Sequence, residues 1–304
     1  MSLKFLDYSQ RMDERMVSEV RSFNRAVTLR IGALDDAFLT RSLPLGRARV
    51  LWEIGSDGVD VRALRARLEL DSGYLSRLLR SLEGAGFVVV KPSSTDGRVR
   101  TARLTRRGAA ERAELDRLSD EAARSLLLPL TGSQRDRLVT AMAEVERLLT
   151  ASAISVRVCD PRHPGARVCM RAYFDELSRR FDAGFDPDRS IPAGDADLRP
   201  PAGLLLLATL RGDPVGIGAL KLHGETAEIK RMWVADSVRG LGLGRRLLAD
   251  IEARAFAHGA RVARLETNRA LTEAIALYKS AGYAEVAAFN DEPYAHHWFS
   301  KDLG

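Results

Sequence analysis

Residues 227–248 read AEIKRMWVADSVRGLGLGRRLL, and this stretch decides the fold of the second half of the chain. The segment AEIKRMWV predicts a strand over 227–234, and the closely spaced glycines of VRGLGLGRRLL predict a turn that enters a helix. A turn of this kind presents several backbone N–H groups together with the positive end of the helix dipole. The stretch therefore predicts a binding site for a pyrophosphate.

Two other phosphate-binding motifs fit this turn less well. A P-loop requires Lys and then Ser or Thr after its last glycine, whereas Gly244 is followed by Arg245 and Arg246. A dinucleotide-binding unit requires Gly-x-Gly-x-x-Gly at the end of a strand, followed by further β-α units. Here a polar segment separates the strand from the turn, and the spacing is Gly-x-Gly-x-Gly. Both motifs are therefore disfavoured.

The sequence around the turn predicts an α/β domain over residues 151–304. Short apolar strands alternate with amphipathic helices, an order that indicates a mixed, mostly antiparallel sheet. The predicted strands are 154–159, 203–211, 215–222, 226–234, 261–268, 283–290 and 294–301, and the predicted helices are 167–183, 242–258 and 270–281.

Three motifs in this half resemble the GNAT family of N-acetyltransferases. RGLGLG at 239–244 satisfies the acetyl-CoA signature R/Q-x-x-G-x-G/A, and ETN at 266–268 and LYKSAGY at 277–283 are similar to the family's C-terminal strand-helix-strand. The resemblance covers about 153–302. It implies the acyl-CoA N-acyltransferase fold and acetyl-CoA as cofactor, bound between splayed strands 226–234 and 261–268. The implied cofactor-binding residues are Met232, Trp233, Val234, Arg239, Gly240, Leu241, Gly242, Leu243, Gly244, Arg245, Asn268 and Tyr278.

Acetyl transfer to an amine needs a base for the ammonium proton and an acid for the leaving thiolate. By resemblance, Tyr278 is the candidate acid, and a core aromatic is the alternative. Glu228 is the candidate base, and an exposed or Lys230-paired carboxylate is its alternative. Asn268 is expected to contact the pantetheine arm or the surroundings of Tyr278, and a simple cap of the strand end is the alternative. Glu266 and His296-His297-Trp298 are candidates for the acceptor pocket, and the long 184–201 segment is expected on the acceptor side.

The first half of the chain carries the basic excess. Of a formal net charge of +6 on 304 residues, the segment 60–108 holds 11 basic and 5 acidic side chains. Helices predicted at 61–68 and 72–84 are followed by a hairpin of FVVVKP and VRTARLT with Asp96-Gly97 at its tip, which is the winged helix-turn-helix plan. A local cationic field on such a plan favours double-stranded DNA as partner.

The candidate DNA-binding residues lie on the predicted second helix and on the hairpin. Polar side chains opposite the leucines of 72–84 are able to reach base edges and phosphates in a major groove, and the hairpin arginines are able to reach the neighbouring backbone. A solvated helix face beside a charged hairpin is the alternative. The candidates are Ser72, Tyr74, Ser76, Arg77, Arg80, Arg98 and Arg100.

This half resembles the MarR family of transcriptional regulators. The resemblance rests on LDSGYLSRLLRSLEGAGFV at 70–88, DGRVR at 96–100 and LTRRG at 104–108, and it covers about 20–150. It implies a DNA-binding and dimerisation domain over 1–150 and a homodimer on a two-fold pseudo-palindromic operator. A long helix predicted at 16–38 and the helices of 108–150 are the elements expected at the dimer interface.

Composition narrows the remaining classes. No segment reaches the length of uncharged apolar sequence that crosses a bilayer, so we expect a cytoplasmic protein with no membrane partner, and no metal site is predicted. Three hypotheses stay open: a bifunctional regulator and N-acetyltransferase acting on a small-molecule, amino-acid or peptide amine; a regulator whose GNAT half senses acetyl-CoA or another ligand without turnover; and an acetyltransferase whose winged helix serves only assembly.

Overall fold

The computed structural model describes residues 14–31, 39, 43–92 and 99–304. Internal contacts divide the chain into two compact units, which meet in sequence between Arg135 and Asp136. This division falls inside helix α6 (Gly132–Ser152), earlier than the predicted domain boundary near residue 150. Each unit is described by itself below, and the boundary near 150 stays a prediction.

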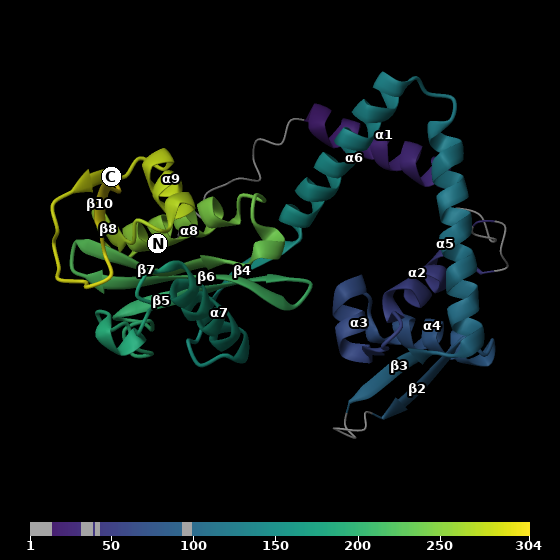
Figure 1. Ribbon diagram of the computed structural model, residues 1–304, viewed down its shortest axis with the longest axis horizontal. Coiled ribbons are helices and arrows are strands. Elements are labelled where there is room, and N and C mark those ends of the chain that lie inside the picture. The colour runs from purple at the N-terminus through teal and green to yellow at the C-terminus, as the bar shows by residue number, and fades with distance from the viewer. Residues whose placement is uncertain (1–13, 32–38, 40–42, 93–98) are drawn as a thin grey trace. The chain divides into compact units, whose positions relative to one another are not determined.

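The first unit is mainly helical and includes a small antiparallel sheet (Figure 1). Its described strands are paired in the order β1-β3-β2, with β3 in the middle. Its elements are α1 (Glu14–Arg30), α2 (Leu45–Ile54), β1 (Val59–Asp60), α3 (Val61–Leu68), α4 (Ser72–Gly84), β2 (Val88–Pro92), β3 (Arg100–Leu104) and α5 (Arg106–Leu127).

Side-chain caps set the start of the two central helices of this unit. Asp60 accepts hydrogen bonds from the backbone N–H groups of Arg62 and Ala63 at 2.6 and 2.9 Å, and Asp71 accepts one from Tyr74 at 2.8 Å. Caps of this kind satisfy amides that have no partner inside the helix. The leucines predicted to face inward then form the core, which includes Leu51, Ile54, Leu64, Leu75, Leu79, Leu82 and Leu115.

The LTRRG motif joins β3 to α5 and fixes that junction against the end of α4. Thr105 accepts from the amide of Gly108 at 3.0 Å and donates its hydroxyl to the carbonyl of Gly86 at 2.6 Å. The start of α5 lies very close to the segment between α4 and β2. A Cβ on Gly108 would stand 1.9 Å from the carbonyl oxygen of Phe87. Glycine is therefore required at 108 by space.

The second unit has the predicted α/β architecture, and its described strands form one seven-stranded sheet in the order β4-β5-β6-β7-β8-β10-β9. The β7–β8 pair is parallel and the other pairs are antiparallel. Its elements are α6, β4 (Ile154–Cys159), α7 (Pro164–Arg180), η3 (Pro187–Arg189), β5 (Gly203–Leu210), β6 (Asp213–His223), β7 (Thr226–Val234), η4 (Asp236–Val238), α8 (Leu243–Ala257), β8 (Val262–Thr267), α9 (Thr272–Ser280), β9 (Ala284–Val286) and β10 (His297–Asp302).

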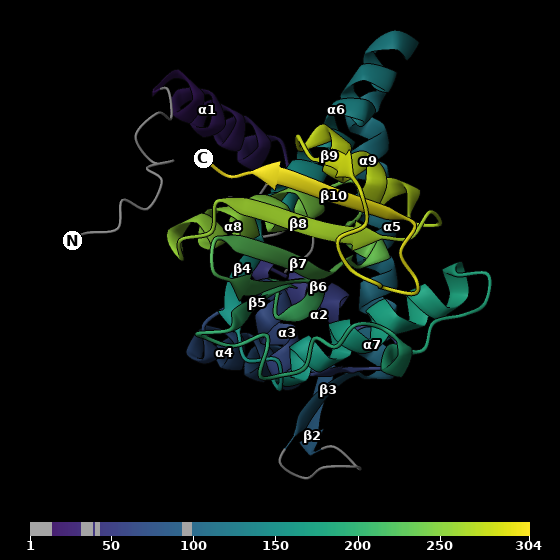
Figure 2. The same cartoon turned by 90° about the vertical axis from the view of Figure 1, so that its left-hand side faces the viewer.

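Helices cover both faces of this sheet, as Figures 1 and 2 show. Helices α8 and α9 share one apolar core with the sheet, built around Leu247, Ile251 and Phe299. Helix α7 packs on the opposite face, where Ala166 and Cys169 meet β5 and β6.

Strands β7 and β8 separate at the level of the predicted site. Their pairing runs from Thr226 opposite Val262 to Glu228 opposite Arg264 and goes no further. On its other edge β7 has a bulge, because its register against β6 shifts between Ile217 and Ala219. Within the bulge Arg231 has φ of 56°, a conformation that side-chain-bearing residues rarely adopt. The two strands are therefore unpaired beyond Glu228, where the resemblance implies that they splay apart.

Most predicted elements are confirmed, with shifts at their ends. The predicted strand 283–290 is wrong beyond Val286, because only Ala284–Val286 pair with β10. The predicted helix 16–38 runs from Glu14 to Arg30, and residues 32–38 lie outside the described ranges. Strand β1 was not predicted, since two residues carry no periodic pattern.

Candidate functional site

A cleft of about 480 Å³ opens in the second unit between α7, the end of β7, the start of α8, and α9. It brings together most of the residues predicted to bind the cofactor. Of those residues, the cleft is lined by Met232, Trp233, Val234, Arg239, Gly240, Gly242, Leu243, Gly244, Arg245 and Tyr278.

The glycine turn has the backbone shape that a phosphate cradle needs. Gly240 and Gly242 have φ of 77° and 79°, and a Cβ at either position would meet no atom within 4 Å. Helix α8 begins at Leu243, so the amides of its first turn have no acceptor inside the helix. Leu241 departs from the prediction, because its amide donates to the carbonyl of Val238 and its side chain packs into the core.

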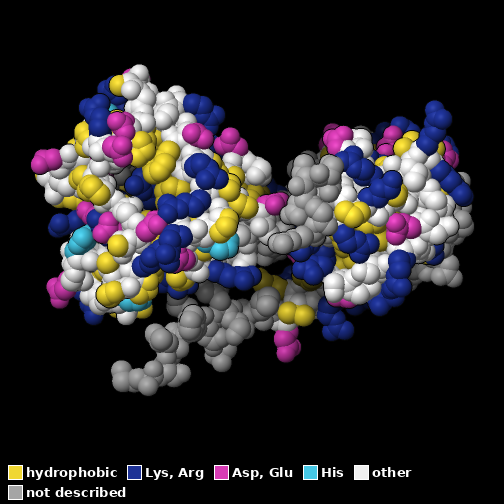
Figure 3. Space-filling model, turned by 90° about the horizontal axis from the view of Figure 1, so that it is seen from below, with side chains coloured by type: hydrophobic (Ala, Val, Ile, Leu, Met, Phe, Trp, Pro, Cys, Tyr) yellow, Lys and Arg dark blue, Asp and Glu magenta, His cyan; other side chains and the backbone are white. Residues whose placement is uncertain are grey.

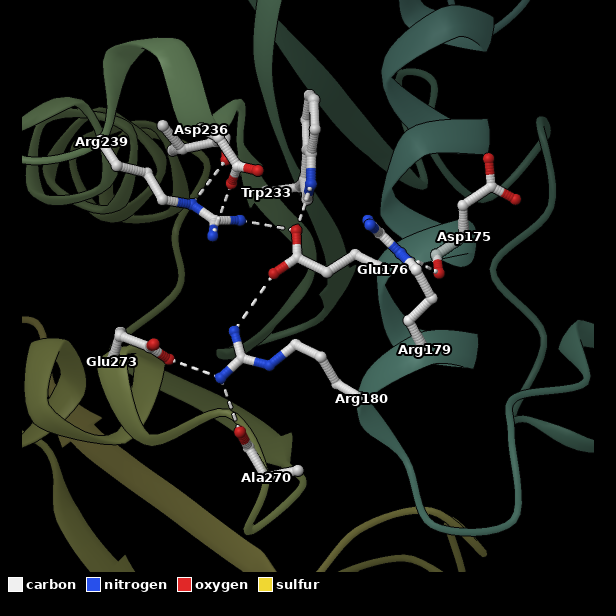
Figure 4. Close-up of polar contacts among 10 residues, drawn as sticks. Asp175, Glu176, Arg179, Arg180, Trp233, Asp236, Arg239, Ala270 and Glu273 are labelled. Atoms are coloured by element: carbon white, nitrogen blue, oxygen red, sulfur yellow. Dashed lines mark hydrogen bonds and ion pairs between the residues drawn. The ribbon is translucent and has the colours of Figure 1, made fainter.

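Arg239 is fixed by protein contacts rather than left free for a ligand. Its guanidinium donates to Glu176 on α7 at 2.6 Å, pairs with Asp236 at 2.7 Å and donates to the carbonyl of Val234 at 3.2 Å. Figure 4 shows Glu176 at the centre of this set, where it also accepts from Trp233 at 2.9 Å. These contacts tie α7 to the turn across the cleft.

A second arginine extends the same network to α9. Arg180 donates to Glu176 at 3.1 Å, to Glu273 at 2.7 Å and to the carbonyl of Ala270 at 2.6 Å (Figure 4). Burial opposes ionisation of Glu176, but hydrogen bonds from Trp233, Arg180 and Arg239 outweigh it and hold the pKa of this carboxyl below its usual value. Glu176 therefore stays charged and clamps the walls of the cleft.

Two tyrosines mark the place where this cleft meets a smaller, second cavity of about 100 Å³. Tyr173 and Tyr278 line both cavities, as does Met232. Burial raises the pKa of Tyr173 to about 12, and it raises the pKa of Tyr278 further above the usual tyrosine value. Tyr278 is 6% exposed and protonated at neutral pH, which suits a proton donor at the junction.

The second cavity is bounded by α7, β7, the end of β8 and residues 292–295. Its charged lining residues are Lys230, Arg231, Glu266 and Glu292. Lys230 and Glu266 form a buried ion pair with each other. Aromatic side chains of Phe181, Phe185 and Tyr294 pack together along one wall.

The predicted base, Glu228, lines neither of these two cavities. Its carboxylate lies 3.8 Å from the ammonium of Lys230 and 3.6 Å from the ring of His223. This is the Lys230-paired arrangement that the sequence left open. Two carboxylates do line the second cavity, Glu292 and the predicted acceptor-pocket residue Glu266.

Asn268 lies in the second cavity and not in the cofactor cleft. Its amide group donates to the carbonyl of Tyr294 at 2.7 Å and accepts from the amide of Ala270 at 2.9 Å. It therefore caps the end of β8, the alternative that the sequence left open. His297 and Trp298 bind Glu285 and Asn290 instead of lining the cavity, and His296 pairs through its backbone with Thr267.

In the first unit, the predicted DNA-binding face of α4 is open to solvent. Ser72, Tyr74, Ser76, Arg77 and Arg80 are all exposed, while the leucines of the same helix are buried. Arg100 is exposed at the start of β3, and Arg98 lies outside the described residues. Lys and Arg side chains are prominent on this unit in the view from the hairpin side (Figure 3).

Models of known protein families match a part of each half of the chain. Residues 170–283 match the model of the acetyltransferase (GNAT) family, and residues 41–99 match that of the MarR family. An IAA acetyltransferase of Azospirillum brasilense is 41% identical over 91 residues. That match covers 29% of this chain and 58% of the relative. The chain thus joins a MarR-family region to a GNAT domain.

Solved structures that resemble this chain align with about half of it. An acetyltransferase of the GNAT family from Staphylococcus aureus is 16% identical, with a TM-score of 0.43 over 49% of this chain and 100% of its own. The ribosomal-protein-S18-alanine N-acetyltransferase of Escherichia coli is 17% identical, with a TM-score of 0.36 over 50% of this chain and 94% of its own.

Within the described ranges, no helix has the length and apolar character needed to span a membrane.

Proposed function

We propose that the chain is a DNA-binding transcriptional regulator fused to an N-acetyltransferase that moves an acetyl group from acetyl-CoA to an amine. The observation that carries the transferase half is the junction of the two cavities at Met232, Tyr173 and Tyr278. One cavity holds the phosphate turn and the other is lined by charged and aromatic groups. A donor and an acceptor would therefore meet at the end of β7.

Acetyl-CoA supplies an activated thioester, and the chain's own groups would position it. The first-turn amides of α8 and the glycines of the turn fit the pyrophosphate. The edge of β7 that faces β8 lacks strand pairing beyond Glu228, so its backbone is available for the pantetheine amides and for the thioester oxygen near Val234. Leu241 and Asn268 have no part in this arrangement.

The chemistry requires two proton movements. The acceptor ammonium loses a proton, its nitrogen bonds to the acetyl carbon, and the carbon–sulfur bond breaks to leave a thiolate. Tyr278 would protonate that thiolate. Glu266, which lines the acceptor cavity, replaces Glu228 as the proposed base. It would receive the ammonium proton through water, with Lys230 holding it in place.

The experiment that tests this function is acceptor-dependent release of CoA with a panel of amino acids, polyamines, aminoglycosides and peptides. Tyr278→Phe should lower kcat about 100-fold and leave acetyl-CoA affinity unchanged. Unchanged turnover would remove Tyr278 as the acid. A folded protein that binds acetyl-CoA but shows no acceptor-dependent release of CoA would support the ligand-sensor alternative.

The DNA-binding half of the proposal rests on the exposed polar face of α4. Arg77→Ala and Arg80→Ala should each weaken binding to a duplex from the upstream region of its own gene by about five- to tenfold. The exposed Arg157 on β4 offers a control, and Arg157→Ala should leave DNA binding unchanged. If the wild-type protein binds no duplex at moderate salt, the winged helix serves assembly only.

We also propose that the protein is a cytoplasmic homodimer that binds a pseudo-palindromic operator. Several large apolar side chains of α1 and α6 are exposed in the single chain, among them Met16, Val20, Phe23, Met142 and Leu149. Apolar surface of this kind usually packs on a partner. Phe23→Asp should shift sedimentation equilibrium from dimer toward monomer, and a wild-type monomer would contradict the proposal.

A further inference from the structure

The second cavity is lined by a cation with an unused hydrogen-bond donor, Arg231. The Nε atom of its guanidinium is buried and has no hydrogen-bond partner among the described residues. Its guanidinium carbon lies 4.7 Å from the ring centre of Phe174 on α7, which holds the side chain against that helix. A buried donor without an acceptor is costly, so the unused donor in this cavity wall indicates a ligand that carries an acceptor.

The other charges of this cavity are already satisfied. Glu292 is 8% exposed and accepts from the hydroxyl of Ser190 at 2.9 Å and from the amide of Ile191 at 2.8 Å. Glu266 is paired with Lys230. Both carboxylates thus have fixed partners within the protein, and Arg231 is the cation whose bonding capacity remains for a ligand.

The bulge in β7 is what places Arg231 in the cavity. Side chains alternate between the two faces of a sheet along a regular strand. In such a strand Arg231 and Lys230, which are consecutive, would lie on opposite faces. The bulge inserts an extra residue, and Arg231 instead contacts Phe174 on the α7 side. The left-handed backbone at Arg231 is strained, and strain of this kind is characteristic of functional sites.

From this geometry we infer that the acceptor is a small amine that carries a carboxylate next to its amino group, an α-amino acid with an apolar side chain, and that Arg231 binds this carboxylate. The inference rests on the proposed function in taking this cavity as the acceptor site. A guanidinium binds a carboxylate through two parallel hydrogen bonds. Because Met232, at the junction of the cavities, is the next residue in the chain, a carboxylate on Arg231 lies close to the point of transfer.

The same cavity accounts for the rest of such a molecule. Glu266 and Glu292 bring negative charge to the lining, which favours the ammonium group that must enter before its proton is lost. The wall of Phe181, Phe185, Ile191 and Tyr294 would contact an apolar side chain. Peptides and polyamines lack the adjacent pair of charges and would use this site poorly.

The test is a comparison of matched acceptors by equilibrium binding to the CoA-saturated protein. L-phenylalanine and L-leucine are each compared with their carboxamides and with the amines left after removal of the carboxyl group. The carboxamides have a lower amine pKa and the decarboxylated amines a higher one, so together they bracket any effect of amine basicity. The wild-type protein should bind the amino acids at least about tenfold more tightly than either analogue.

Arg231→Gln should abolish this preference for the amino acids. Arg231→Lys should retain part of it, because lysine supplies the positive charge but not the paired donors of a guanidinium. Arg269→Gln, at an exposed arginine outside both cavities, is the matched control and should behave as wild type. Unchanged CoA affinity and thermal unfolding of Arg231→Gln would show that its fold is intact.

Two results would overturn the inference: equal binding of amino acids and carboxamides to the wild type, or a preference that survives in Arg231→Gln. Binding of neither class at millimolar concentration would also overturn it. If amino acids bind through Arg231 and no amine supports release of CoA, the inference stands and the proposed transferase function fails.

Discussion

The two units present different kinds of group to an anion. On the first unit the candidate anion partners are exposed guanidinium side chains, Arg77 and Arg80 on α4 and Arg100 on β3. In the second unit they are mainly backbone amides at the start of α8, with the nearby Arg239 already bonded to Glu176 and Asp236. In the proposed function the basic excess of residues 60–108 serves DNA binding, and the second unit would hold phosphates with almost no net charge.

This difference matters because the two kinds of group respond differently to change. Flexible side chains on a surface add up, and each contributes a modest, salt-sensitive amount. Amides in a turn act together, since they depend on one backbone conformation. A single substitution should therefore damage the turn more than it damages the helix face.

The largest effect is expected at Gly242. Gly242→Val places a β-branched side chain at φ of 79°, which distorts the turn, and acetyl-CoA affinity should fall about 10- to 100-fold. Calorimetric titration with acetyl-CoA measures this. Gly224→Val is a matched control, because Gly224 has φ of 62° and equally open surroundings in the β6–β7 turn. Equal loss of affinity in both variants would mean that general strain, not the turn, is responsible.

Gly108→Ala should destabilise the first unit and leave the stability of the second unit unchanged. Its Cβ would meet the carbonyl oxygen of Phe87, so the first unit should lose about 1–3 kcal/mol of unfolding free energy. Thermal unfolding measured with and without acetyl-CoA distinguishes the two units, because the ligand raises the unfolding temperature of the second unit only. Gly132→Ala, at an open helical position, should not destabilise the protein. A matching fall in acetyl-CoA affinity in Gly108→Ala would contradict independent units.

The pH dependence of turnover should reflect the burial of Tyr278. Because burial raises the pKa of this phenol above its ordinary value of about 10, the proton-bearing form persists as pH rises, and kcat should not decline through loss of this proton below pH 10. Measurement of kcat from pH 7 to 10 tests this. A decline in that range that disappears in Tyr278→Phe would contradict the assignment.

The smallest effect is expected at Arg147 on α6, whose guanidinium donates to the carbonyl of Gly240 at 3.1 Å. Since this side chain is half exposed, Arg147→Ala should weaken acetyl-CoA binding by only about two- to fivefold. Arg137→Ala, at an exposed position on the same helix, is the control. An effect as large as that of Gly242→Val would place a side chain among the main phosphate partners.

Local patterns in the sequence predicted the elements and the turn. The spacing of glycines determines which backbone can accept positive φ, and the leucine period determines which face of α4 is buried, so both were readable over a few residues. The cap at Asp60 and the junction at Thr105 and Gly108 follow from the same local rules.

The walls of the site could not be predicted, because they depend on contacts between distant segments. Glu176 and Arg180 look like ordinary charged residues of a surface helix until α7 packs beside β7 and α9. The position of Arg231 is harder still to predict. Strand alternation assigns its side chain to the face away from α7, and only the bulge of β7 against β6 brings it to the α7 side. Glu228 illustrates the converse: its strand position predicted a base, and its neighbours His223 and Lys230 hold it outside both cavities.

The most direct test of the contrast between the two units is the salt dependence of both binding reactions in the same preparation. DNA affinity should fall steeply between about 50 and 200 mM salt. Arg77→Ala should reduce the slope of the logarithm of affinity against the logarithm of salt concentration by about one. Acetyl-CoA affinity should fall with a clearly shallower slope, unchanged by Arg77→Ala. Equal slopes for the two ligands would contradict the assignment of arginine side chains to one unit and backbone amides to the other.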